Sequence, residues 1–201
     1  MMRAPFSTVE AWNAGFTYIE YRTHLEELLK NNQTTGPDQS DKMVQYAKLN
    51  MQRMRRVEKT FEFSSHLHET LTSIVNPQRW LVISEGWCGD AAQSVPALAL
   101  AARVNHLIEL RIVLRDEHPA LMDQYLYHGT RSIPKLIIMN ERFVELANWG
   151  PRPAVAQQIV DAGKRGGLPH EIWVEEVHAR YAKDKARSLQ QELTEMLKAI
   201  R

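Results

Sequence analysis

Apolar residues near the start of the chain repeat every three or four positions. Between residues 7 and 30 the large apolar side chains share one stripe of an amphipathic helix, formed by Val9, Trp12, Phe16 and Ile19. Ser7-x-x-Glu10 fits a capping box at the start of this helix. The next residues, 31–38, are polar and contain Gly-Pro, so they predict a loop.

Two more helices are predicted before residue 77. Helical spacing returns after Ser40 or Asp41, either of which suits an N-cap, and the apolar stripe contains Val44, Ala47, Met51 and Met54. A shorter helix from residue 65 to about 75 ends at Asn76-Pro77, because the residue before a proline disfavours helical conformation. Residues 1–77 are therefore expected to form a helical N-terminal extension.

The pattern changes at Trp80 to short apolar runs separated by helical segments. Strands are predicted at residues 80–84, 109–114, 135–139 and 142–147, the last two joined by a tight turn at Asn140-Glu141. Helices are predicted at residues 91–105, which include Pro96, and from His118-Pro119 through Tyr125. This order indicates an α/β fold with a mixed sheet.

Two helices are predicted after the last strand. Pro151 and Pro153 open the first, which ends near Gly163. Apolar residues four, three and four positions apart then predict one long C-terminal helix, on which lie Leu189, Leu193, Met196 and Ile200. We expect this segment, residues 165–201, to pack on the core.

Composition narrows the possible classes of protein. The chain has 201 residues, 44% of them apolar, and 25 Lys and Arg against 24 Asp and Glu, with no basic tail. We therefore expect one domain with helical additions and no nucleic-acid partner. Because no apolar run approaches eighteen residues and residues 1–7 lack the apolar stretch of a signal peptide, we expect a cytoplasmic protein without a membrane span.

The single cysteine, Cys88, falls where a predicted strand turns into a helix. Ligands of such sheets sit at the carboxyl ends of the parallel strands, where residues 86–90 and 115–117 both fall. The amides and dipole at the helix start would stabilise a thiolate and lower the thiol pKa. Asp90 works against this unless it turns away, and a lone cysteine is more often a small buried hydrophobe.

The motif around Cys88 resembles the active site of thioredoxins. Residues 87–91 read Trp-Cys-Gly-Asp-Ala where that family has Trp-Cys-Gly-Pro-Cys, and Pro96 matches the proline in its first active-site helix. Residues 131–134, Arg-Ser-Ile-Pro, resemble the loop with the cis-proline, and Gly150 matches the glycine after the last strand. The wider pattern is similar to a bacterial group of thioredoxin-like proteins with a single-cysteine motif, a helical N-terminal extension and no settled activity.

This resemblance implies a thioredoxin-like domain at residues 78–164. It also implies that Pro134 is cis, that the Ile133 backbone is free to pair with substrate, and that Trp87 and Trp149 flank a groove. The alternatives are an ordinary trans proline and two core aromatic residues. The catalytic residue is then Cys88, and the substrate-binding candidates are Trp87, Gly89, Asp90, Arg131, Ile133, Pro134, Trp149 and Gly150.

Two departures from the family decide the expected chemistry. Ala91 stands where the resolving cysteine should be, and Val82 stands where thioredoxins bury an acid. What remains is attack by Cys88 on a disulfide to give a mixed disulfide with glutathione or a protein, with glutathione as a possible co-substrate and no bound cofactor. A non-catalytic binding module and a peroxide sensor, in which Cys88 becomes a sulfenic acid, are the alternatives.

Other candidate residues carry weaker signals. His66-x-His68 and His170-Glu171 lack the spacing of a metal site, and no metal is expected. The cluster Arg53, Arg55 and Arg56 reads as a solvated helix face. Arg115 and Asp116 either pair with each other or bind a glutathione carboxylate. The apolar stripes of the flanking helices must cover the sheet or form a homodimer interface.

Overall fold

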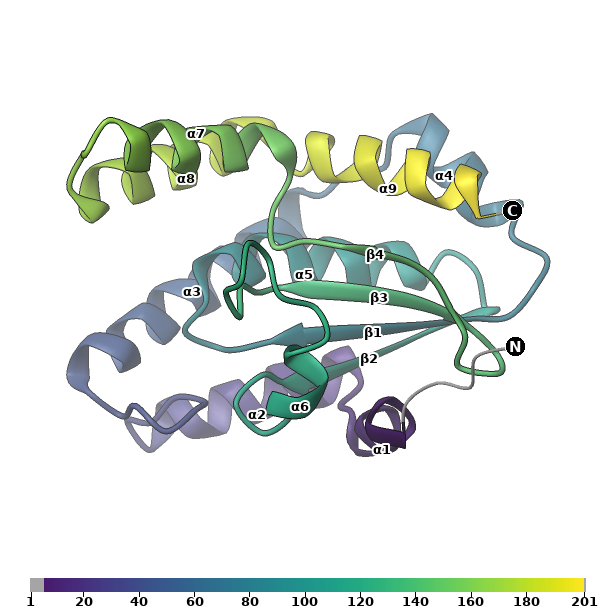
Figure 1. The fold of residues 1–201 in the computed structure, drawn as a ribbon, viewed down its shortest axis with the longest axis horizontal. Coiled ribbons are helices and arrows are strands. Elements are labelled where there is room, and N and C mark those ends of the chain that lie inside the picture. Colours follow the sequence, from purple (N-terminus) through teal and green to yellow (C-terminus); the bar gives the residue numbers. More distant parts are fainter. Residues whose placement is uncertain (1–5, 201) are drawn as a thin grey trace.

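The computed structural model describes residues 6–200, and within them the chain forms an α/β fold around a four-stranded mixed sheet (Figure 1). The strand order is β2-β1-β3-β4. β1 (Gln78–Ser84) and β2 (Ile108–Leu114) are parallel, whereas β3 (Lys135–Asn140) runs antiparallel to β1 and to β4 (Glu145–Trp149). The central side chains of β1 are fully buried, as its continuous apolar run predicts.

Helices cover both faces and both edges of this sheet. In Figure 1, α5 (Gly89–Ala102) and α3 (Asp41–Thr60) lie behind the sheet, and the short α6 (Pro119–Met122) lies in front. α4 (Ser65–Thr72) packs against the C-terminal α9 (Arg187–Ala199) on the β4 side. Among the residues described, no helix is long and apolar enough to cross a membrane.

The predicted N-terminal helix is wrong in one respect, because it is two helices, α1 (Phe6–Ala14) and α2 (Tyr18–Lys30). Phe16, between them, exchanges backbone hydrogen bonds with Ile112 and so extends the β2 edge of the sheet. Thr17 caps α2 through a capping box with Glu20. Ser7 lies inside α1, and the side-chain contacts of the capping box predicted there lie outside what the structure describes.

The predicted long C-terminal helix is likewise two helices, α8 (His170–Asp184) and α9. The break falls at Lys185 and Ala186, which both have left-handed backbones, with φ of 52° and 61°. α9 places its leucines in the main core, whereas α8 packs on α7 (Ala154–Arg165) around a separate small core. The buried residues of that core are Ala156, Val160, Val177 and Tyr181.

Several predicted boundaries shift in the structure. α4 ends at Thr72, and α6 is a single turn that excludes Tyr125. β4 begins at Glu145 instead of residue 142, because the Asn140 side chain accepts hydrogen bonds from the amides of Arg142 and Val144 and closes a longer hairpin loop. These shifts leave the order of the elements as predicted.

Candidate functional site

Cys88 connects two segments that the sequence places far apart. It is the N-cap of α5, where its sulfur accepts a hydrogen bond from the Ala91 amide at 3.4 Å. Its thiol donates to the Ile133 carbonyl at 3.3 Å, and the Ile133–Pro134 peptide bond is cis. The side chain is only 8% exposed, so the sulfur lies between the start of α5 and the loop before β3.

The position of Cys88 at a helix start does not lower its pKa, and that prediction is wrong. The pKa is raised to about 12, first by burial of the thiol and then by the nearby charge of Asp90. The amides of Ala91 and Asp90 act in the opposite direction but do not compensate. Cys88 is therefore a protonated thiol at neutral pH.

The Asp90 side chain is tied to other elements. Its carboxylate accepts hydrogen bonds from Arg152, at 2.7 and 3.1 Å, and from the Tyr181 hydroxyl at 2.7 Å. Tyr181 lies on α8, so this carboxylate joins the start of α5 to the C-terminal segment. Burial of the Tyr181 hydroxyl and then the charge of Asp90 raise its pKa. The hydroxyl therefore stays protonated and donates to Asp90.

A cavity of about 440 Å³ opens beside Cys88. Its walls come from α3, the loop after β1, the loop before β3, Arg152 and helices α7 and α8. The predicted site residues that line it are Trp87, Cys88, Gly89, Asp90, Arg131 and Ile133.

The other predicted site residues lie outside this cavity. Trp149 and Gly150 line a different hollow, and the Trp149 indole donates to Glu192 of α9 at 2.7 Å. Pro134 lies behind the lining, against Gly150, where an added Cβ would meet the Pro134 carbonyl oxygen at 2.2 Å. Trp149 and Gly150 are therefore not part of the lining of the Cys88 cavity.

Two arginines considered in the sequence analysis line the cavity, and each forms an ion pair with an aspartate. Arg131 forms an exposed ion pair with Asp123, with nitrogen–oxygen distances of 2.7 Å. Arg115 pairs with Asp116 at 2.8 Å, one of the two arrangements expected, and its guanidinium lies 4.7 Å from the ring centre of Trp87. Trp87 is thus held by a cation against its face.

Sequence reasoning missed the contribution of α3 to the cavity. Arg53 was predicted on a solvated face, but it is half-buried and lines the cavity. It donates to Asn50 at 2.8 Å, and Asn50 donates to the Gly86 carbonyl at 3.0 Å. The i, i+3 spacing of Asn50 and Arg53 is a signal in the sequence, but nothing local indicates that Arg53 lines the Cys88 cavity.

α8 supplies the other missed wall, through His170, Trp173 and His178. The His178 ring occupies the space over Gly89, since an added Cβ there would lie 2.6 Å from its Cε1 atom. Burial and then the charge of Arg53 lower the pKa of His178 to about 4, so the ring is neutral. Among the described residues, no group of three His, Cys, Asp or Glu side chains is placed to hold a metal ion.

Comparisons with known proteins identify the family and the fold. A family model described as thioredoxin matches residues 36–164. The chain belongs to the thioredoxin family. The match includes α3 with Arg53, but α8 and α9 lie beyond its end. A thioredoxin-family fold is thus extended here by helices that close one side of the cavity.

Two solved structures share this fold along nearly their whole length. One is a protein of unknown function from Pseudomonas aeruginosa, with a TM-score of 0.65, 21% identity and coverage of 100% of both chains. The other is an HIV epitope-scaffold, with a TM-score of 0.63, 19% identity and coverage of 96% of this chain and 98% of that one. None of the curated proteins matches the chain. At these identities the likeness shows the fold alone.

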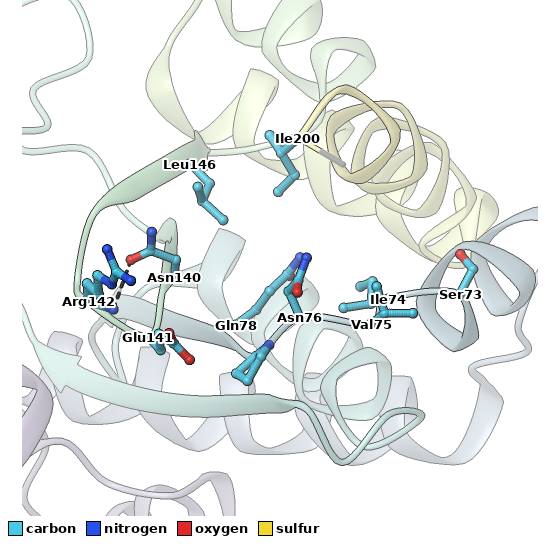
Figure 2. A pocket seen from close by; sticks show the side chains of 11 residues that line it. Ser73, Ile74, Val75, Asn76, Gln78, Asn140, Glu141, Arg142, Leu146 and Ile200 are labelled. Carbon is cyan, nitrogen blue, oxygen red and sulfur yellow. Dashed lines mark hydrogen bonds between the residues drawn. The ribbon is translucent and has the colours of Figure 1, made fainter. Parts of the chain in front are cut away.

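A further cavity, of about 450 Å³, lies at the opposite end of β1 from Cys88 (Figure 2). It is bordered by the segment before β1, the β3–β4 hairpin and Ile200. Leu146 and Ile200 face it from one side in Figure 2, and Asn76 and Gln78 from another. It shares no lining residue with the Cys88 cavity.

Proposed function

We propose that this thioredoxin-family chain forms a mixed disulfide through Cys88. The thiol reacts with a disulfide R–S–S–R, a bond forms between Cys88 and one sulfur, the S–S bond breaks, and the other sulfur leaves with the proton as R–SH. The observation that carries the proposal is the placement of the sulfur in a cavity wall, beside the backbone of Ile133.

The adduct would persist until an external thiol removes it. The chain contains one cysteine, and Ala91 occupies the place of a resolving thiol. Attack by a small thiol such as glutathione, or by a partner protein, would then release Cys88 in the reverse reaction. This chemistry suits a protein that holds a thiol, not one that cycles by itself.

The raised pKa of Cys88 makes the exchange slow at neutral pH. Only the thiolate attacks a disulfide, and a pKa of about 12 leaves a very small thiolate fraction near pH 7. The same fact disfavours peroxide sensing, because peroxide also oxidises the thiolate.

A non-catalytic binding module is the second candidate, and the protonated thiol favours it. In this case the cavity binds its ligand without a covalent step, and Cys88 acts as a hydrogen-bond donor to Ile133. Replacing Cys88 by Ser would then leave binding intact.

The two candidates separate in one experiment. The chain is incubated with hydroxyethyl disulfide, an uncharged reagent, at pH 7 and at pH 9.5, and intact mass is followed with time. We expect one hydroxyethylthio adduct per chain, faster at pH 9.5, and none in the Cys88→Ser variant. Circular dichroism verifies that the fold is retained at pH 9.5. A wild-type chain that stays unmodified at both pH values would contradict the exchange and leave the binding module.

A further inference from the structure

The cavity beside Cys88 carries an excess of positive charge. Among the described residues, Asp90 is the only carboxylate that lines the cavity. The arginines that line it are Arg53, Arg115, Arg131 and Arg152. Arg152 is neutralised by Asp90 itself. Arg115 and Arg131 hold carboxylates that lie outside the lining.

Among the arginines of this lining, Arg53 is the one without a carboxylate bound to it in the described residues. Within residues 6–200 it forms no ion pair, and the hydrogen bond that the structure gives its guanidinium goes to the neutral Asn50. The charge of Asp90 acts on it, but that carboxylate is already bound by Arg152 and Tyr181. Burial and the neighbouring Arg56 lower the pKa of Arg53, as expected for a cation without a counter-ion.

The guanidinium of Arg53 lies beside the residue that follows Cys88. A Cβ added to Gly89, the residue after Cys88, would lie 3.3 Å from Nη1 of Arg53. The guanidinium is held there by Asn50, which is itself anchored on the Gly86 carbonyl. The cation is thus fixed to the same loop that carries Cys88, which is how a recognition group is positioned relative to a reacting atom.

We propose that the cavity binds a small thiol or disulfide that carries carboxylates, with one carboxylate on Arg53. The inference rests on the proposed exchange at Cys88, because it names the substrate class of that exchange. Arginine suits this ligand, since its planar guanidinium donates paired hydrogen bonds to a carboxylate.

The shape of the cavity favours a small molecule over a protein segment. Its volume of about 440 Å³ falls within the range that encloses small ligands. α8 supplies a wall through Trp173, Val177 and His178, and this wall restricts the open groove along which an extended chain would pair with Ile133. Trp87 and Trp173 offer apolar surface for the uncharged part of the ligand.

The test uses S-methylglutathione, a thioether that carries two carboxylates and cannot exchange. Isothermal titration calorimetry measures its affinity for the wild-type chain and for Arg53→Gln and Arg55→Gln. Arg55 is the matched control, because it lies on the same helix with an exposed side chain that faces Glu26. We expect Arg53→Gln to weaken binding at least about tenfold, as for the loss of a charge-assisted hydrogen bond, and Arg55→Gln to leave it unchanged.

A second arm does not depend on the folding of a variant. The diethyl ester of S-methylglutathione has no carboxylate, and we expect it to bind the wild-type chain at least about tenfold more weakly than the acid. No binding of the acid, equal binding of acid and ester, or equal affinity of wild type and a folded Arg53→Gln variant would each overturn the proposal.

These results are separate from those of the exchange itself. An adduct with hydroxyethyl disulfide and no binding of S-methylglutathione would overturn the anionic site and leave the exchange standing. Carboxylate-dependent binding without any adduct would support the site and contradict the exchange.

Discussion

Cys88 is subject to two opposing effects of different size. A helix start stabilises a nearby anion by about 0.3–1 kcal/mol, which is less than one pKa unit. Burial raises the pKa of an acid by up to about 3–5 units, and at Cys88 burial is the larger effect. The environment that buries the sulfur therefore matters more for its reactivity than its place at the start of α5.

Removing the charge of Asp90 should make the thiol more reactive. Asp90 is the second cause of the raised Cys88 pKa, and Arg152 would stay nearby in an Asp90→Asn variant. We expect the pKa to fall and alkylation by iodoacetamide at pH 8.5 to be about three- to tenfold faster, which corresponds to about half to one pKa unit. Asp41→Asn, an exposed carboxylate in the first turn of α3, is the control. An unchanged rate in Asp90→Asn would show that its charge does not reach the sulfur.

His178 should make the fold less stable in acid. Its pKa is about 4 in the folded chain and about 6.5 when unfolded, so between these values the unfolded chain binds more protons. Stability is therefore lost as the pH falls from 6.5 to 4. The groups facing the ring are Arg53, Arg56 and Asp90.

The check is the melting temperature at pH 7 and at pH 5, measured for the wild type, His178→Gln and the exposed-site control His66→Gln. We expect the acid-induced decrease to shrink only in His178→Gln. An equal decrease in all three chains would place the acid sensitivity elsewhere.

Helices α7 and α8 pack so closely that one position admits only glycine. A Cβ added to Gly163 of α7 would lie 2.6 Å from Cβ and 2.7 Å from Cγ of Trp173. Alanine gains about 1 kcal/mol over glycine in a helix, but the Trp173 Cβ is fixed to the α8 backbone and cannot rotate away. We expect Gly163→Ala to lower the free energy of unfolding by about 1–3 kcal/mol in urea denaturation. A gain in stability would mean that the helices have room to separate.

The order of strands and helices was predictable, whereas apolar spacing alone did not indicate two helix breaks. Residues 80–84 predict a buried strand without further information, because every side chain in the run is apolar or small. Gly15 and the Thr17-x-x-Glu20 capping box are local signals for the first break, but they do not show that Phe16 pairs with Ile112, nearly a hundred positions away. At Lys185 and Ala186 the chain bends because α8 packs on α7 whereas α9 packs on the main core. Both breaks depend on partners that spacing does not identify.

The candidate site was predictable only in part, because its sequence motifs were found but the helices that complete the cavity were not. The motifs at residues 87–90 and 131–134 meet because each adjoins the end of a central strand, and the sequence places both there. Arg53 and His178 come from helices on either side of this region in sequence, and only the tertiary fold brings them to Gly89. Trp149 was assigned to the groove by family resemblance, yet in this chain its indole donates a hydrogen bond to Glu192 of α9.

Within residues 6–200 the molecule has two cores of unequal size, which gives its parts different stabilities. The main core joins the sheet to α5 and α9, whereas α7 and α8 share a small cluster of their own. Small peripheral clusters open locally with a lower free energy than global unfolding. Because α8 forms a wall of the Cys88 cavity, such opening would expose the thiol without unfolding the sheet.

Native-state hydrogen exchange can separate the two cores. Val177→Ala removes a side chain from the small cluster, and we expect faster exchange in α7 and α8, unchanged exchange in β1 and β3, and faster alkylation of Cys88. Leu193→Ala, in the main core, is the comparison, and it should lower the global free energy of unfolding by about 2–5 kcal/mol. Exchange in β1 that rises as much as exchange in α8 in the Val177→Ala variant would mean that the two clusters unfold together. Access to Cys88 would then require the sheet itself to open.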